Sequence, residues 1–304
     1  MLLLLDFGRP SGAVQKDRRI AVKRINVLLL MVLAVAIGLF AGYHIWVHNR
    51  LDTVGPVISI EEGMLEISVK APEKALLTGI HAMDDRDGDV TDSILVESVY
   101  GINGDNVTTV TYAAFDRAGN VTKVQRQVRY VDYQPPRFEA HRSLTFPGNI
   151  GFDLMDYVGA YDVLEGDIRR RVHATLVSDT KAVNTEGNHQ VKLMVTNSLG
   201  DTVEAVIPVM VYSSEWYSAE VKLSDYLIYL KQGDAFRAEN YLRTFVLRGD
   251  PIDISGTVPA DINVEIHNEV QTDMPGVYEV TYILSRNLNG TNHSGIAKLI
   301  VIVE

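Results

Sequence analysis

The sequence contains an internal repeat, and a repeat restricts the possible folds of a chain more than any single motif does. Residues 82–90 read Ala-Met-Asp-Asp-Arg-Asp-Gly-Asp-Val and align with residues 160–168, which read Ala-Tyr-Asp-Val-Leu-Glu-Gly-Asp-Ile. A third copy keeps the Gly-Asp pair as Gly249 and Asp250. A chain of 304 residues is therefore expected to hold three small, similar units.

The repeated part of the chain shows the alternation that is typical of β-strands. Apolar and polar residues alternate in short runs, for example over 109–115, 190–195 and 277–283. Turn-forming Asn-Gly pairs separate such runs at 103–104 and 289–290. No helical pattern of similar strength occurs after the first fifty residues, so the repeats are predicted to be all-β.

An apolar run precedes the repeats. Residues 27–47 contain no Asp, Glu, Lys or Arg, and as a helix they would span about 31 Å, enough for one bilayer crossing. Only Arg50 follows closely, whereas six basic residues precede the run: Arg9, Lys16, Arg18, Arg19, Lys23 and Arg24. Because cytoplasmic flanks carry the excess of basic residues, the N-terminus is predicted to be cytoplasmic and the repeats extracellular.

A cleavable signal peptide is the alternative interpretation of this run. Residues 27–43 are apolar or small without a break, which is longer than the usual apolar region of a signal peptide. Cleavage after Gly38 would leave residues 39–47 as an exposed apolar terminus. A retained signal anchor at the cell membrane is therefore favoured.

Three stretches carry a resemblance to a known family. Residues 82–91, the turn at 115–120 and the run at 275–282 resemble the bacterial surface-protein Ig-like domain, which is related to hyalin repeats and also occurs in pesticidal crystal proteins. The resemblance covers residues 56–304. It implies tandem sandwiches of about seven strands on a cell surface, usually without a catalytic role, and it names no ligand.

The predicted fold is all-β, with three tandem Ig-like β-sandwich domains preceded by one transmembrane helix. The predicted parts are a cytoplasmic tail at 1–25, a signal-anchor helix at 26–48, and Ig-like domains at 54–132, 135–212 and 217–304.

Composition excludes several functions. The chain has no cysteine, so disulfides, Cys-ligated zinc sites and thiol catalysis are ruled out. Asp and Glu outnumber Lys and Arg by 39 to 28, and a net charge of −11 argues against nucleic acid as a partner. Residues 178–181 match a Ser-x-x-Lys nucleophile motif but lack its partner motifs, and no Gly-x-Ser-x-Gly, phosphate-loop or zinc-protease motif occurs. We therefore expect no enzymatic activity and no bound cofactor, with calcium as the one possible exception.

The possible calcium site is the densest acidic stretch of the chain. Its members are Asp84, Asp85, Asp87, Asp89 and Asp92. Calcium takes six to eight oxygen ligands, and carboxylates are prominent among them. The spacing does not match an EF-hand, because Gly88 lies too early in the loop. The alternative is a tight turn in which aspartate side chains accept backbone N–H groups.

A second candidate site is aromatic. Trp216 and Tyr217 lie just before the third repeat, and aromatic rings can stack on sugars. Packing within a linker would explain the same residues.

Together these features predict a non-enzymatic, membrane-anchored repeat protein that acts as a surface interaction or structural stalk module. Its expected partners are the lipid bilayer, through residues 27–47, and a surface protein or polysaccharide. The alternatives are a carbohydrate- or cell-wall-binding protein and an accessory subunit of a membrane complex. The latter would use the small residues Gly38 and Gly42 for helix packing.

Overall fold

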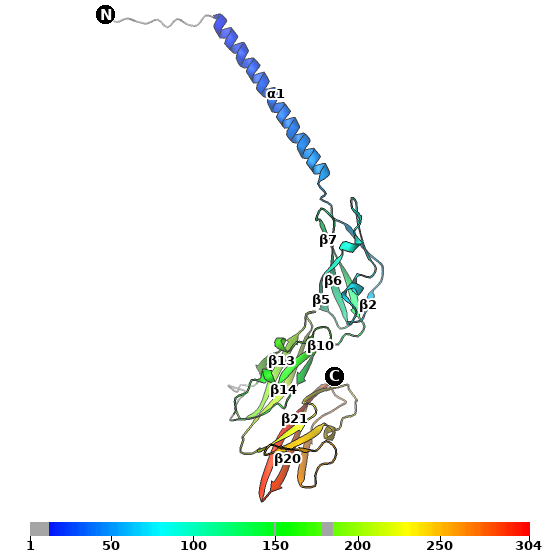
Figure 1. Cartoon of the computed structure of the whole chain (residues 1–304), viewed down its shortest axis with the longest axis vertical. Coiled ribbons are helices and arrows are strands. Elements are labelled where there is room, and N and C mark those ends of the chain that lie inside the picture. The colour runs from blue at the N-terminus through cyan, green and yellow to red at the C-terminus, as the bar shows by residue number, and fades with distance from the viewer. Residues whose placement is uncertain (1–11, 149, 178–184) are drawn as a thin grey trace, which may run out of the picture. The chain divides into compact units, whose positions relative to one another are not determined.

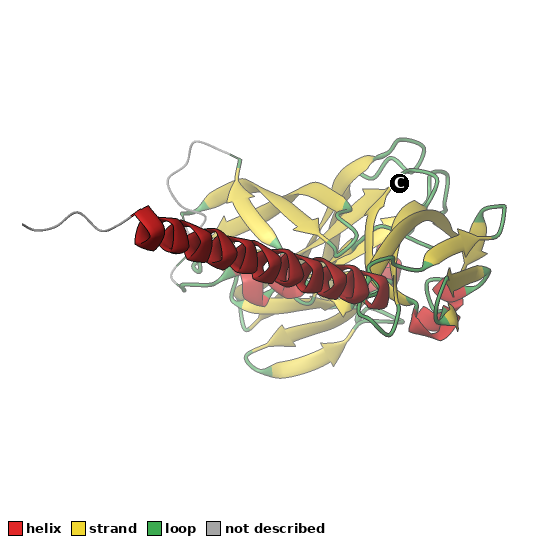
Figure 2. Ribbon diagram, turned by 90° about the horizontal axis from the view of Figure 1, so that it is seen from above, coloured by secondary structure: helices red, strands yellow, loops and turns green. Residues whose placement is uncertain are grey.

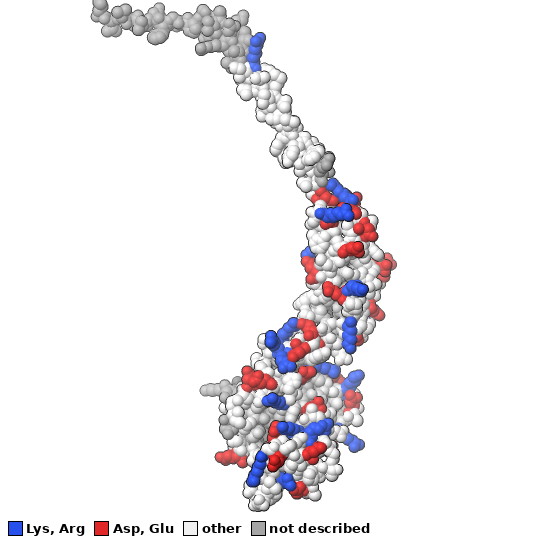
Figure 3. All heavy atoms as spheres, viewed as in Figure 1, with Lys and Arg blue, Asp and Glu red and all other residues white. Residues whose placement is uncertain are grey.

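A long helix begins the part of the chain that the structure describes. The computed structural model describes residues 12–148, 150–177 and 185–304, so part of the predicted tail at 1–25 lies outside the described residues. Helix α1 spans Gly12–Arg50. Its part Lys23–Val47 is long and apolar enough to cross a membrane, and none of it is buried by the rest of the protein. Residues 25–47 contain no Asp, Glu, Lys or Arg, and Figure 3 shows the helix as white beyond the basic side chains at the start of this part.

Strands make up most of the chain after α1, with short 3₁₀ helices between them (Figures 1 and 2). The strands before residue 132 are β1 (Val57–Ile60), β2 (Leu65–Ile67), β3 (Ile80–Asp84), β4 (Gly88–Asp89), β5 (Leu95–Ile102), β6 (Val107–Phe115) and β7 (Val121–Tyr130). Those between 135 and 212 are β8 (Arg137–Ala140), β9 (Thr145–Pro147), β10 (Val158–Asp162), β11 (Gly166–Asp167), β12 (His173–Leu176), β13 (Gly187–Thr196) and β14 (Thr202–Tyr212).

The remaining strands are β15 (Ala219–Leu223), β16 (Leu227–Leu230), β17 (Leu242–Leu247), β18 (Asp250–Asp253), β19 (Ile262–Asn268), β20 (Gly276–Leu288) and β21 (Thr291–Val303). The 3₁₀ helices are η1 (Glu73–Leu77), η2 (Thr91–Ser93), η3 (Leu154–Asp156), η4 (Arg169–Arg171) and η5 (Ala238–Tyr241).

The sheets repeat the same topology three times. Each of the predicted ranges 54–132, 135–212 and 217–304 contributes one three-stranded and one four-stranded sheet. The three-stranded sheets have the orders β1-β3-β4, β8-β10-β11 and β15-β17-β18, and the four-stranded sheets β2-β7-β6-β5, β9-β14-β13-β12 and β16-β21-β20-β19. In each four-stranded sheet the first-named pair of strands is parallel. The predicted all-β fold of tandem β-domains after one apolar helix is confirmed.

The chain forms two compact units. The first comprises the described residues up to Ser59 with 80–94 and 113–123, and the second comprises 60–79, 95–112 and 124–304. The predicted domain limits stay a prediction.

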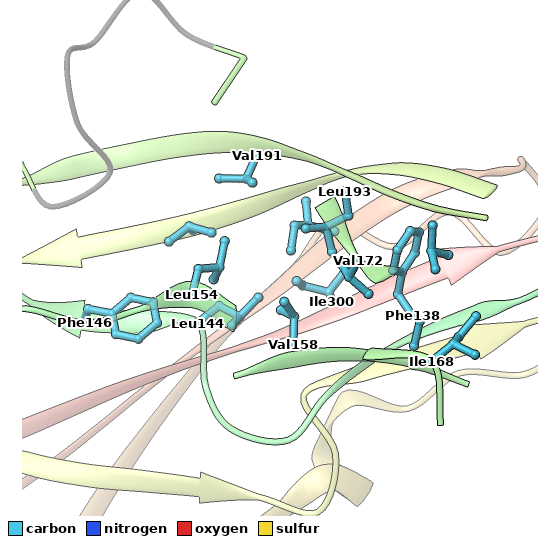
Figure 4. Close-up of a cluster of buried hydrophobic side chains, with 14 of the residues drawn as sticks. Phe138, Leu144, Phe146, Leu154, Val158, Ile168, Val172, Val191, Leu193 and Ile300 are labelled. Atoms are coloured by element: carbon cyan, nitrogen blue, oxygen red, sulfur yellow. The ribbon is translucent and has the colours of Figure 1, made fainter. Parts of the chain in front are cut away.

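Buried apolar side chains from two sheets meet in the middle of the second unit. Phe138 and Val158 come from the three-stranded sheet of residues 135–212, whereas Leu193 and Ile207 come from its four-stranded sheet. Figure 4 shows Phe138, Val158 and Leu193 turned toward the middle of this core. A separate buried cluster, which includes Phe245 and Tyr282, fills the third range. The repeats at 135–212 and 217–304 are therefore β-sandwiches.

Strand β21 is buried on both faces. Leu299, Val301 and Val303 point into the cluster of their own range. Ile300, which is 1% exposed, belongs to the cluster of residues 135–212, and Ile302 packs against that cluster. On the same face Lys298 is 5% exposed, and its Nζ donates to both carboxylate oxygens of Glu279 at 3.0 Å. One strand thus contributes to two cores because successive side chains point to opposite faces.

A tyrosine joins the second and third ranges. The phenolic oxygen of Tyr229 on β16 accepts the backbone N–H of Phe138 on β8 at 2.7 Å. The Arg137 guanidinium lies 4.8 Å from the centre of the Tyr229 ring. Burial raises the pKa of Tyr229 to about 12. The neutral phenol is therefore the form that the folded state stabilises.

This shift predicts a loss of stability in alkali. Because the pKa of Tyr229 is higher in the folded than in the unfolded chain, its contribution is complete below pH 10 and disappears as the pH rises to about 12. Tyr229→Phe should lower the free energy of unfolding at pH 8 by about 1 to 3 kcal/mol, since the Phe138 N–H loses its acceptor. Urea unfolding between pH 8 and 12 should show a shallower alkaline decline in the variant, and an identical decline would contradict the assignment.

Candidate functional site

The predicted acidic stretch folds into the turn between β3 and β4. Asp84 ends β3 and is 6% exposed. Its Oδ1 accepts the backbone N–H groups of Arg86 and Asp87, both at 2.9 Å. The side chain therefore closes the turn, as the alternative sequence interpretation expected. Its other oxygen, Oδ2, is buried and has no hydrogen-bond partner among the described residues.

Only two of the five predicted acids come together, and a third acid from elsewhere joins them. Asp52, Asp84 and Asp85 each place one carboxylate oxygen within 4.8 Å of the other two, and we call these residues the Asp52 cluster. Asp52 lies two residues after the end of α1, and its side chain is 10% exposed. The Arg86 side chain lies beside the cluster, with its Nε 3.7 Å from Asp52 Oδ2.

The other predicted acids serve the local structure. Asp87 Oδ2 accepts the backbone N–H of Arg117 at 2.8 Å. Asp89 Oδ1 accepts the N–H of Thr91 at 2.9 Å, and hydrogen bonds from Thr91 lower the pKa of the exposed Asp89. Asp92 is exposed in η2. None of these three belongs to the Asp52 cluster.

Asp52 is held by the turn between β6 and β7. The side-chain amide of Asn120 donates to the backbone carbonyls of Asp52 and Val54, both at 3.2 Å, and to Asp116 Oδ2 at 2.6 Å. Asp116 Oδ1 accepts the Asn120 N–H at 2.7 Å. Burial by itself would raise the pKa of Asp116, but the hydrogen bonds from the Asn120 side chain and from backbone N–H groups outweigh it and lower the pKa. Asp116 is therefore a buried, ionised group.

The second repeat builds the same two turns but satisfies every carboxylate oxygen of its buried aspartate. Asp162 takes the place of Asp84, and its Oδ1 accepts the N–H groups of Leu164 and Glu165. Asn197 takes the place of Asp116, because it makes the same hydrogen bonds at the start of its turn, to Asp201 instead of Asn120. Its side-chain amide donates to Asp162 Oδ2 at 2.9 Å.

Sequence reasoning missed Asp52 and Asp116. Asp52 lies in the linker after the apolar helix, outside every repeated motif. The sequence did contain a signal for Asp116. Alignment of the turn at 116–120 with the turn at 197–201 pairs the acidic Asp116 with the amide Asn197.

The predicted aromatic residues do not form a groove with each other. Trp216 is 69% exposed, whereas the Tyr217 ring packs edge-on against Tyr212 with centroids 5.0 Å apart. A groove of about 650 Å³ lies beside Tyr212, and its walls combine aromatic and charged side chains. Among the lining residues are Phe146, Tyr157, Tyr212, Tyr226 and Arg142.

Comparisons with known proteins do not name a family. No protein-family model matches the chain, and no curated protein matches its sequence. Three similar solved structures are the protocadherin GammaB4 extracellular domain, Drosophila N-cadherin EC1-4, and CBM51-2 with GlcNAc and INT domains from Clostridium perfringens ZmpB.

Their sequence identities to this chain are 10%, 14% and 13%, and the matches cover 82%, 83% and 81% of it. The same matches cover 49%, 76% and 44% of the other chains, so this chain spans about half of the protocadherin structure. The TM-scores of 0.19, 0.21 and 0.21 are too low to support an argument about function.

Proposed function

We propose that the chain is a non-enzymatic, membrane-anchored surface protein whose β-repeats act outside the cell as an interaction or structural module. The observation that carries this proposal is the contrast between helix and repeats. The apolar side chains of the helix are exposed, for example Leu39 at 71% and Phe40 at 66%, whereas the repeats gather many of theirs into buried clusters. Exposed apolar side chains along a helix of this length support its insertion into a lipid bilayer.

The roles of the buried polar groups support a structural module. In the described repeats Asp116, Asp162 and Asn197 close turns, and Lys298 pairs with Glu279. These side chains are committed to holding strands and turns in place, which is a structural rather than a catalytic use.

Contacts inside the second unit also fit a module that holds its repeats firmly. The hydroxyl of Tyr133, between the first two predicted domains, donates to Asp201 Oδ2 at 2.7 Å and accepts from the Asn197 amide at 2.8 Å. Burial raises the pKa of Tyr133. The backbone N–H of Gly101 donates to the carbonyl of Leu199. These bonds restrict bending between neighbouring repeats.

The test is the topology of the full chain in a bacterial membrane. A C-terminal epitope should be labelled by antibody on cells whose outer barriers are opened but whose inner membrane is intact, and an N-terminal epitope only after that membrane is lysed. Carbonate extraction should leave the chain in the membrane fraction. Labelling of the N-terminal epitope alone would reverse the proposed orientation, and release by carbonate would favour a cleaved signal peptide.

Binding of a polysaccharide is the second candidate function, and the groove beside Tyr212 favours it. Its rings offer stacking faces, and Arg142 and Glu220 add polar groups to the lining. Detergent-solubilised chain should then sediment with isolated bacterial cell walls. Absence of sedimentation would leave a protein partner, to be captured by cross-linking on intact cells.

A further inference from the structure

We propose that the Asp52 cluster binds one calcium ion, which fastens the segment after the membrane helix to the turn of the first repeat. The ligand set differs from the one that the sequence suggested, since Asp52 enters it and Asp87, Asp89 and Asp92 leave it. The inference goes beyond the proposed function, and its expected affinity rests on the proposed extracellular position of the repeats, whereas the titration that tests it does not depend on the orientation of the chain in a membrane.

The spacing of the carboxylates fits a single calcium ion. Calcium binds oxygen at about 2.3 to 2.6 Å, so two ligand oxygens on one ion lie up to about 5 Å apart. The oxygens of Asp52, Asp84 and Asp85 lie within 4.8 Å of one another. Three carboxylates at this distance repel each other, and the 45% exposed Arg86 side chain supplies one positive charge. A divalent cation would balance the remainder.

The unpaired oxygen of Asp84 is the second and independent observation. A buried carboxylate oxygen without a partner lowers the stability of the fold, because it has lost its hydrogen bonds to water and forms none within the protein. In the second repeat the amide of Asn197 fills this need for Asp162. In the first repeat the equivalent residue is Asp116, whose two carboxylate oxygens both accept hydrogen bonds from Asn120, so it offers Asp84 no donor. A cation is the partner that suits a carboxylate surrounded by carboxylates.

The position of Asp52 gives the ion a structural role. Asp52 belongs to the short segment between α1 and β1, and Asn120 holds its backbone carbonyl. Asp84 and Asp85 belong to the turn after β3. An ion bound by all three would join two segments that are distant in the sequence.

Calorimetric titration of the detergent-solubilised full chain with calcium chloride tests the proposal. The wild type should bind one ion, with a Kd of about 10⁻⁴ to 10⁻³ M, the range of extracellular calcium modules. Asp84→Asn should weaken binding by about tenfold or more, since the charge of the ligand set decides affinity. Asp85→Asn should do the same, and because Asp85 is exposed this variant should fold normally.

Asp89→Asn is the matched control, because it removes one negative charge from the same stretch outside the cluster. Its Kd should stay within about twofold of the wild type, as expected for an exposed charge that is no ligand. Equal weakening by Asp85→Asn and Asp89→Asn would reduce the effect to general charge attraction and overturn the proposal. So would the absence of calcium binding by the wild type.

Discussion

Exchange of Asn197 for aspartate is expected to lower the free energy of unfolding by about 3 to 5 kcal/mol, because it places an unbalanced charge against a buried one. Asp162 is fully buried, and the Asn197 amide donates to its Oδ2 and to the hydroxyl of Tyr133. An ionised aspartate can make neither bond. Urea unfolding followed by circular dichroism at pH 7.5 measures the change.

Asn188→Asp is the matched control for this variant. It makes the same substitution within β13, the strand that ends just before Asn197, but Asn188 is exposed and its Oδ1 lies 3.4 Å from Lys298 Nζ. Its stability should stay within about 0.5 kcal/mol of the wild type. Equal stability of Asn197→Asp and Asn188→Asp would show that the buried Asp162–Asn197 pair does not hold the second repeat together.

Truncation of Ile300 to alanine is expected to cost about 2 to 5 kcal/mol, the usual loss for a fully buried isoleucine. The unusual part of this prediction is where the loss should occur. Ile300 lies on a strand of the third range, yet its side chain belongs to the core of residues 135–212 (Figure 4). Amide hydrogen exchange should therefore accelerate in β10 and β13, within the second repeat.

Val301→Ala provides the comparison, because Val301 is the next residue and belongs to the cluster of the third range. Its effect on exchange should be concentrated in β17 and β20. Ile150→Ala, at a site that is 59% exposed, should change little. If Ile300→Ala accelerated exchange only in the third range, β21 would not join the two cores.

The general architecture could be predicted from the sequence because it depends on local patterns. The alternating run 109–115 lies in β6, 190–195 lies in β13 and 277–283 lies in β20. The apolar run 27–47 lies in α1. Period-two alternation and a long apolar run each have one common structural solution, so no distant contact was needed to interpret them.

The burial of β21 on both faces shows what alternation alone cannot give. A strand covered on both sides is typically a continuous apolar run, and residues 296–303 nearly form one. Lys298 interrupts that run and suggests a solvent-facing side. The structure instead buries Lys298 and neutralises it with Glu279. That solution depends on a partner from another strand, which a local pattern does not contain.

The candidate site could be predicted only in part for the same reason. The high density of acidic residues in this stretch predicted Asp84 and Asp85, which both belong to the Asp52 cluster. It also predicted Asp87, Asp89 and Asp92, which make other hydrogen bonds or remain exposed. Asp52 becomes part of the cluster only in the folded chain, because the Asn120 side chain donates hydrogen bonds to the backbone carbonyls of the linker that contains Asp52. Which acids share one ion is thus decided by turn geometry rather than by spacing along the chain.

The double role of β21 also affects the order in which the protein matures. A ribosome delivers the chain from its N-terminal end, and domains generally fold as they emerge. The seven strands described between residues 135 and 212 are complete once Tyr212 has been made, but their core still lacks Ile300. During synthesis the second repeat therefore exposes part of its apolar core to solvent until the third repeat has been made.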